Sequence, residues 1–191
     1  MKVLKFLFGT IALLIIAFLA IGFFTPTVSY GHEIEVSKTI EEAWAVQQDE
    51  TKLGEWLDGF KSIEHLSGKV GEVGSKYKVT VIPEPDADEF IMTETIISKK
   101  ENDHMTLNMD SDMMVFDQTT YFSERNGKTV IKTDSKVNGK GMMMRSMFAL
   151  MSMGGMFQQK EVENIERLKT VIESNTTDYF PAPELVEEVM E

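Results

Sequence analysis

The feature that most constrains this chain is residues 33–57, where the hydrophobic period changes from two to about 3.6. Ile34 and Val36 alternate with glutamates, which is typical of a half-buried strand. Ser37 or Thr39 can then cap a helix with acidic residues in its first turn, and a second short helix follows. The segment therefore predicts one strand and two short helices.

Six further strands are expected, separated by turn signals such as Asn126-Gly127, a strong two-residue hairpin sequence. Their ranges are 60–66, 76–82, 90–99, 105–109, 114–123 and 129–137. From Gly141 the period becomes 3.6, and apolar residues share one helical face as far as Ile172. The pattern predicts an α+β fold with six to seven strands and a long C-terminal helix at 157–174.

The N-terminus carries an uncharged, overwhelmingly apolar run at residues 6–24. As a helix, these 19 residues would be about 28 Å long, which matches the hydrocarbon thickness of a bilayer. Lys2 and Lys5 precede the run, whereas Glu33 and Glu35 follow it with no Lys or Arg nearby. The positive-inside rule therefore predicts a cytoplasmic N-terminus and an extracytoplasmic domain.

A signal peptide that is cleaved to release a secreted domain is the alternative. The run is longer than the usual apolar region of a signal peptide, and Ser29-Tyr30-Gly31 is a late cleavage site. We therefore expect an uncleaved single-pass anchor in the cell membrane. The predicted organisation is a cytoplasmic segment 1–5, a transmembrane helix 6–24, a linker 25–30, a domain 31–174 and a C-terminal tail 175–191.

The composition excludes several classes of function. The sequence has no cysteine, which rules out disulfides, thiolate metal sites, lipoprotein acylation and a cysteine nucleophile. A formal net charge of −12 argues against nucleic acid as a partner, because its phosphates require a basic surface. The three histidines share no metal-like spacing, and the sequence contains no nucleophile motif. We expect neither a metal nor a cofactor.

The order strand, two helices, six strands and long helix resembles the START-like helix-grip superfamily, also called SRPBCC, which includes polyketide cyclase/dehydrase and lipid-transport proteins. The resemblance covers residues 31–174 and follows an N-terminal transmembrane anchor. The matching residues are Ile34 to Ser37, Ala43-Trp44, Trp56, Gly68, Val70-Gly71, Val73-Gly74, Gly127 to Thr129 and Ile165 to Lys169. The resemblance implies a curved sheet that grips the C-terminal helix, with a hydrophobic cavity between them. The superfamily shares no catalytic motif, so it assigns no catalytic residue here.

Side-chain periodicity predicts which residues line that cavity. Period two places Met105 and Leu107 on one face of their strand. Period 3.6 turns Met147, Met151 and Ile165 of the C-terminal helix toward the sheet. The complete predicted lining is Met105, Leu107, Phe116, Phe122, Ile131, Met147, Met151, Gly154 and Ile165.

Seven of the 14 methionines lie between residues 142 and 156. Thioethers are soft ligands for Cu(I), but methionine also fills irregular apolar gaps and suits pockets that accept varied ligands. No histidines accompany these methionines. A pliable cavity wall or a membrane-facing edge is therefore the favoured interpretation, and copper is not.

Two features near the centre of the C-terminal helix, Gly154-Gly155 and Glu161, each allow two interpretations. Gly154-Gly155 either marks a kink or junction, or opens the cavity and lets the preceding segment move. Glu161 falls on the apolar face if the helix is continuous, which would make it a polar anchor for a ligand. If the glycines reset the helical phase, Glu161 points to water instead.

Two functions fit these expectations. The first is a membrane-anchored protein that binds a lipid or other hydrophobic small molecule. The alternative is an enzyme of the polyketide cyclase or dehydratase kind that acts on a hydrophobic substrate. Convergence of two titratable side chains in the cavity would favour the enzyme, because catalysis requires an acid and a base.

Overall fold

The computed structural model describes residues 2–83 and 86–181. It contains an N-terminal helix, an eight-stranded antiparallel sheet, two short helices and two C-terminal helices. In chain order the elements are α1 (Lys2–Phe24), β1 (Thr27–Tyr30), β2 (Glu33–Val36), α2 (Ile40–Gln48), the 3-10 helix η1 (Glu50–Lys52), α3 (Leu53–Trp56), β3 (Phe60–Ser67), β4 (Lys76–Val81), β5 (Phe90–Lys100), β6 (His104–Asp110), β7 (Met114–Arg125), β8 (Lys128–Gly139), α4 (Gly141–Met153) and α5 (Met156–Glu173).

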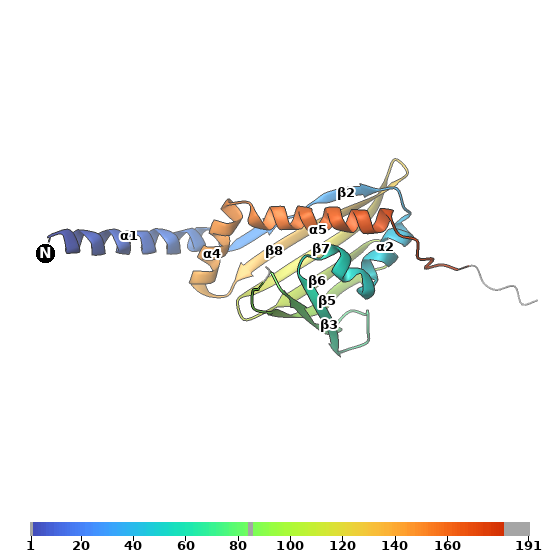
Figure 1. Cartoon of the computed structure of the whole chain (residues 1–191), viewed down its shortest axis with the longest axis horizontal. Coiled ribbons are helices and arrows are strands. Elements are labelled where there is room, and N and C mark those ends of the chain that lie inside the picture. Colours follow the sequence, from blue (N-terminus) through green and yellow to red (C-terminus); the bar gives the residue numbers. More distant parts are fainter. Residues whose placement is uncertain (1, 84–85, 182–191) are drawn as a thin grey trace, which may run out of the picture.

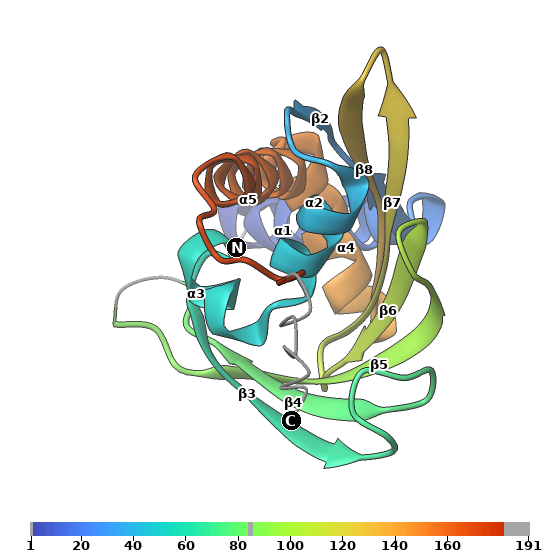
Figure 2. The same cartoon turned by 90° about the vertical axis from the view of Figure 1, so that its right-hand side faces the viewer.

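The sheet has the order β1-β8-β7-β6-β5-β4-β3, and β2 also pairs with β8. β1 pairs with the second half of β8 and β2 with its first half, so these two short strands lie end to end along one edge. The sheet is thus seven positions wide, and it curves around α5 and α2 (Figure 2). The predicted α+β helix-grip fold is confirmed. Residues 25–30, expected as a linker, differ from the prediction because they contain β1.

The concave face of the sheet carries the apolar side chains that the alternation predicted. Ile34 and Val36 of β2 are buried, as are alternate residues of β8. α5 packs Ile165, Leu168 and Ile172 onto this face, because residues spaced three and four apart share one side of a helix.

The core divides into two clusters along the length of α5. The distal cluster, far from α1, includes Ile34, Val36, Trp44, Trp56, Tyr77, Ile96, Met105, Phe122, Ile131, Ile165, Leu168 and Ile172. The proximal cluster, near α1, comprises Val28, Val137 and Phe148 with Tyr30, Met114, Phe116, Met144, Met147, Met151 and Phe157. In the distal cluster the Trp44 ring meets Phe122 edge to face, with 5.2 Å between ring centroids.

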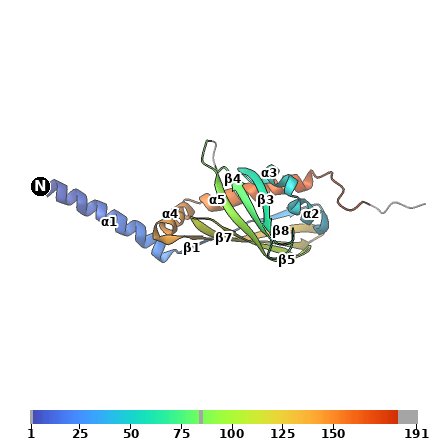
Figure 3. The same cartoon turned by 90° about the horizontal axis from the view of Figure 1, so that it is seen from below.

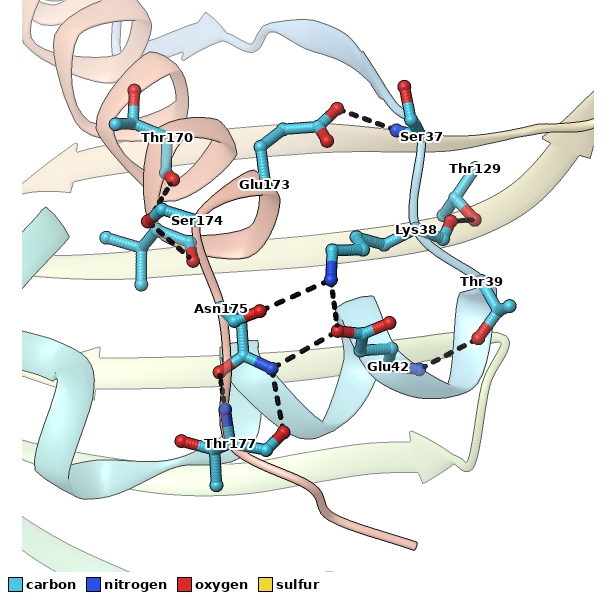
Figure 4. Close-up of polar contacts among 11 residues, drawn as sticks. Ser37, Lys38, Thr39, Glu42, Thr129, Thr170, Glu173, Ser174, Asn175 and Thr177 are labelled. Atoms are coloured by element: carbon cyan, nitrogen blue, oxygen red, sulfur yellow. Dashed lines mark hydrogen bonds and ion pairs between the residues drawn. The ribbon is translucent and has the colours of Figure 1, made fainter.

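Polar contacts fix the distal end of α5 to the connection between β2 and α2 (Figure 4). Lys38 Nζ donates to Glu42 Oε1 at 2.7 Å, and Asn175 Nδ2 donates to the same oxygen at 3.2 Å. The hydrogen bond from Lys38 lowers the pKa of Glu42. The described part of the tail continues this packing, since Tyr179 donates to Asp49 Oδ2 at 2.7 Å. The rest of the predicted tail, residues 182–191, lies outside the described residues.

α4 and α5 are separate helices that meet at Gly154-Gly155. Gly155 has φ 78°, a left-handed conformation that favours glycine, and it provides the sharp turn between the two helices. Of the interpretations left open for this dipeptide, the junction is therefore the one observed. α4 lies between α5 and α1 at the proximal end of the domain (Figure 1).

α1 projects from the domain as a solitary helix (Figures 1 and 3). Its length and composition suffice to cross a membrane, and its side chains are exposed from Val3 to Ile16. It meets the domain through its last turn, where Gly22 is buried against α4.

Candidate functional site

Polar side chains separate the two clusters where β7, β8 and α5 face one another. Along β7, Gln118 stands on the same face as Phe116 of the proximal cluster and Phe122 of the distal cluster. β8 and α5 show the same change from apolar to polar and back. The resulting polar layer consists of Gln118, Thr133, Ser135 and Glu161.

Glu161 is the centre of the polar layer and is buried. The Thr133 hydroxyl donates to its Oε1, and Gln118 Nε2 donates to the two carboxylate oxygens at 3.2 and 3.3 Å. Gln118 Nε2 also donates to Ser135 Oγ at 3.1 Å. Burial raises the pKa of Glu161, while hydrogen bonding and the charge of His32 oppose that rise.

The interpretation that Glu161 points to water is wrong. The glycine junction does begin a new helix, but α5 has its own phase, in which Phe157, Glu161 and Ile165 are spaced four residues apart on one face. Because its carboxylate accepts hydrogen bonds from Gln118 of β7 and Thr133 of β8, Glu161 links the gripped helix to the sheet.

Beside the polar layer, part of the concave face remains accessible to solvent. Leu107 and Met109 of β6 and Phe116 of β7 point to the concave side but are only half-buried. The helices pack mainly on β1, β2, β7 and β8 at one side of the sheet and on β3 at the other. Their arrangement leaves the middle strands less covered.

Glu94 of β5 completes this accessible region. The strand register aligns it with Met109, which in turn pairs with Phe116. Glu94 is half-buried and forms no hydrogen bond or ion pair with any residue that the structure describes. Burial, helped by the charge of Glu50, raises its pKa from 4.5 to about 7. We refer to Glu94, Leu107, Met109 and Phe116 as the open patch.

The open patch combines an apolar surface with a carboxyl group that can donate or accept a hydrogen bond near neutral pH. Adjacent strands lie about 4.8 Å apart, so the backbones of β5 and β7 are separated by roughly 10 Å. Glu94 and the polar layer thus flank the apolar side chains from two sides.

The structure divides the predicted lining residues into three groups. Met105, Phe122, Ile131 and Ile165 are buried in the distal cluster. Leu107, Phe116, Met147 and Met151 are half-buried around the proximal cluster and the open patch. Gly154 is exposed at the corner between α4 and α5.

Sequence reasoning did not single out Glu94. The signal was present, because Met92, Glu94 and Ile96 alternate along one strand and the first and last of these are buried. A charged residue at an inward position between two buried ones indicates a functional carboxyl or a buried ion pair.

Two polar hollows lie along β8. One, of about 360 Å³, is bordered by Asp117, Thr119, Tyr121 and Lys136, and the other, of about 410 Å³, by His32, Glu33, Lys132 and Asp134. Neither is bordered by a predicted lining residue of the hydrophobic cavity.

No protein-family model matches the chain, and no curated protein matches it. The chain does match solved structures. Protein CV1439 from Chromobacterium violaceum is 12% identical with a TM-score of 0.60, over 78% of this chain and 99% of that one. Ara h 8.0201 is 16% identical with a TM-score of 0.55, over 78% and 99% of the two chains. The di-domain ARO/CYC StfQ from the steffimycin biosynthetic pathway is 10% identical with a TM-score of 0.63, over 78% and 51%.

These likenesses establish the helix-grip fold, in which a curved antiparallel sheet surrounds a C-terminal helix. On this fold, the chain combines the apolar helix α1, a methionine-rich α4 packed against it and an open patch that contains Glu94.

Proposed function

We propose that this is a membrane-anchored protein that binds a lipid or other hydrophobic small molecule on the open patch. The observation that carries the proposal is Glu94, a half-buried carboxyl with a pKa of about 7 and no protein partner among the described residues, set among incompletely buried apolar side chains. A site of this composition suits a molecule that is mostly apolar and carries a hydroxyl, carbonyl or amine.

The fold is consistent with such a ligand. Two structural neighbours, StfQ and BexL, are di-domain ARO/CYC proteins of biosynthetic pathways. Their occurrence in biosynthetic pathways supports a small-molecule ligand here, although fold alone does not determine function.

Two contacts support α1 as a retained anchor. Val28 of β1 is buried and Tyr30 stacks on Phe157 with 5.4 Å between ring centroids, so cleavage near Gly31 would remove a strand from the sheet. Gly22 packs so closely on α4 that a Cβ there would lie 2.5 Å from the Ser146 backbone nitrogen. Lys2 and Lys5 favour a cytoplasmic N-terminus and thus support an extracytoplasmic domain.

Binding is tested with the full-length protein in detergent, by native mass spectrometry for co-purifying molecules and by titration of a fluorescent fatty-acid probe. Leu107→Trp should fill the open patch and weaken probe binding at least about tenfold, or roughly 1.4 kcal/mol. Ile97→Trp is the matched control, because Ile97 is an exposed residue at the irregularity in β5. Equal binding by both variants, with unchanged circular dichroism, would place the site elsewhere.

The second candidate is a cyclase- or dehydratase-like enzyme, which the near-neutral pKa of Glu94 favours, since general acids and bases work best near the ambient pH. Incubation of a co-purified molecule with the protein distinguishes the two functions. An enzyme should convert it, with loss of water detectable by mass, and Glu94→Gln should abolish conversion while binding persists. A carrier should leave the molecule unchanged.

A further inference from the structure

α4 has two apolar faces, and only one of them is needed for the core. Met144, Met147, Phe148 and Met151 pack into the proximal cluster. On the other side of the helix, Ser146 is fully buried where α1 crosses α4.

Exposed apolar side chains surround that crossing. Met142, Met143, Leu150 and Met153 are exposed by 38%, 66%, 42% and 76%. At about 100° per residue, these four and Ser146 fall within one arc of roughly 100° on the helix surface. The arc contains no charged residue. Arg145, the one charged residue of α4, lies outside it, and its Nε donates to the Gly139 carbonyl at 3.2 Å.

We propose that α4 lies on a lipid bilayer with this exposed arc immersed at the boundary between headgroups and acyl chains. The proposal rests on the membrane anchoring proposed above. α1 meets α4 through its last turn, so a bilayer that surrounds the exposed part of α1 ends at the level of α4. The arc flanks α1 on the same side of α4 and therefore faces the surface from which α1 emerges.

Apolar burial, more than charge, would hold α4 there. The protein carries a net charge of −12, which opposes binding to anionic lipid. Near the start of α4, Lys140 is paired with Asp110 at 2.6 Å. Methionine and leucine side chains gain free energy by entering the acyl boundary whatever the lipid charge.

This placement also specifies the source of the ligand. The same helix that meets lipid on its outer arc contributes Met144, Met147 and Met151 to the proximal cluster, which adjoins the open patch at Phe116. A molecule dissolved in the membrane would reach the open patch past this pliable methionine wall. The chemical class is therefore a membrane-dissolved apolar molecule rather than a water-soluble one.

The test uses single cysteines, since the natural sequence has none. Met143→Cys and Met153→Cys are labelled with an environment-sensitive fluorophore in full-length protein reconstituted into phosphatidylcholine vesicles. Quenching by lipids with a doxyl group near the headgroup should be several-fold stronger at these positions than at Lys128→Cys, an exposed position in the distal β7–β8 hairpin. Iodide in the water should show the reverse order.

Ile11→Cys in α1 separates this proposal from the anchoring on which it depends. Lipids with a doxyl group deep in the acyl chain should quench the label at Ile11→Cys. If they do so and no doxyl lipid quenches the α4 labels, α1 spans the membrane and the proposal for α4 is wrong. If no lipid quenches Ile11→Cys, the anchor itself fails and the proposal for α4 fails with it. The fluorescence at Met153→Cys could instead change with the number of protein molecules per vesicle and not with doxyl lipid. That result would mean that the arc contacts a second copy of the chain, which also overturns the proposal.

Discussion

At the scale of single residues, two carboxyl groups on the concave face have different roles because their partners differ. Glu161 accepts hydrogen bonds from Thr133 and Gln118, and its buried carboxylate stabilises the position of α5 on the sheet. Glu94 has no such partner among the described residues and faces accessible apolar side chains. The unpartnered carboxyl is therefore the better candidate for a contact with a ligand.

Glu94 should make the folded state less stable as pH rises. Its pKa in the folded protein is about 7 and its ordinary value is 4.5, so the folded protein binds more protons than the unfolded chain between these values. Stability is fully present below the unfolded value and falls as pH increases through this window. The free energy of unfolding should therefore fall between about pH 5 and about pH 8, and Glu94→Gln should reduce this fall by about 1–3 kcal/mol. Chemical unfolding followed by Trp fluorescence at the two pH values measures it.

Glu101→Gln, at an exposed position just beyond β5, is the control for that measurement. Burial also raises the pKa of Glu161, so a residual slope of the same sign should persist in the Glu94 variant. A slope unchanged by Glu94→Gln would mean that the carboxyl is fully hydrated in the folded protein.

At the scale of elements, the corner between α4 and α5 decides what the methionines do. Had the two helices been one, the methionines of α4 would extend the face of α5. The corner instead turns α4 toward α1 and exposes Met143 and Met153 beside it. Gly155 makes the corner possible through its left-handed backbone, whereas Gly154 has φ −77°, which any residue can adopt.

These neighbouring glycines allow a matched pair of substitutions. Gly155→Ala should destabilise the protein by about 1–2 kcal/mol, because an L-residue is strained at positive φ. Gly154→Ala should be neutral or stabilising by up to about 1 kcal/mol, because alanine restricts the unfolded chain. In the folded protein its Cβ would lie 3.4 Å from the Met151 carbonyl oxygen, a tolerable contact. Thermal unfolding of both variants measures the difference, and equal costs would contradict a strained corner.

At the scale of the whole molecule, α1, α4 and the concave face of the sheet lie in sequence along one axis (Figure 1). α1 projects from the proximal end, and α4 follows it. α5 runs from there along the sheet to the distal end, where Lys38 and Asn175 donate hydrogen bonds to Glu42 (Figure 1). In this arrangement the proximal end of the concave face is the end nearest the proposed bilayer.

Orientation in the membrane is tested with the same cysteine-free background. Lys128→Cys should react with a membrane-impermeant maleimide in intact cells, whereas Val3→Cys, which keeps both lysines, should react only after the membrane is opened, because Lys2 and Lys5 favour a cytoplasmic N-terminus. The opposite pattern would invert the topology. Release of Lys128→Cys protein into the medium without residues 2–24 would instead indicate a cleaved signal peptide.

The sequence alone predicted features that depend on local periodicity. Alternation at Ile34 and Val36, the change to a period of 3.6 after residue 140 and the apolar run 6–24 each correspond to an observed element. The order of these elements resembles that of the START-like superfamily, and this resemblance predicted the helix-grip fold. The strand β1 was missed, since four residues in a proline-containing segment carry little periodic signal.

Tertiary structure decided which inward residues are packed and which remain accessible. Periodicity gave Met105 and Leu107 the same orientation, and both contact the distal cluster, yet Met105 is buried whereas Leu107 is only half-buried and belongs to the open patch. It also could not determine whether Glu161 meets water or how far Met143 lies from α1. These properties depend on strand register, on the angle at the α4–α5 corner and on what covers each side chain, all of which arise from contacts between residues far apart in the sequence.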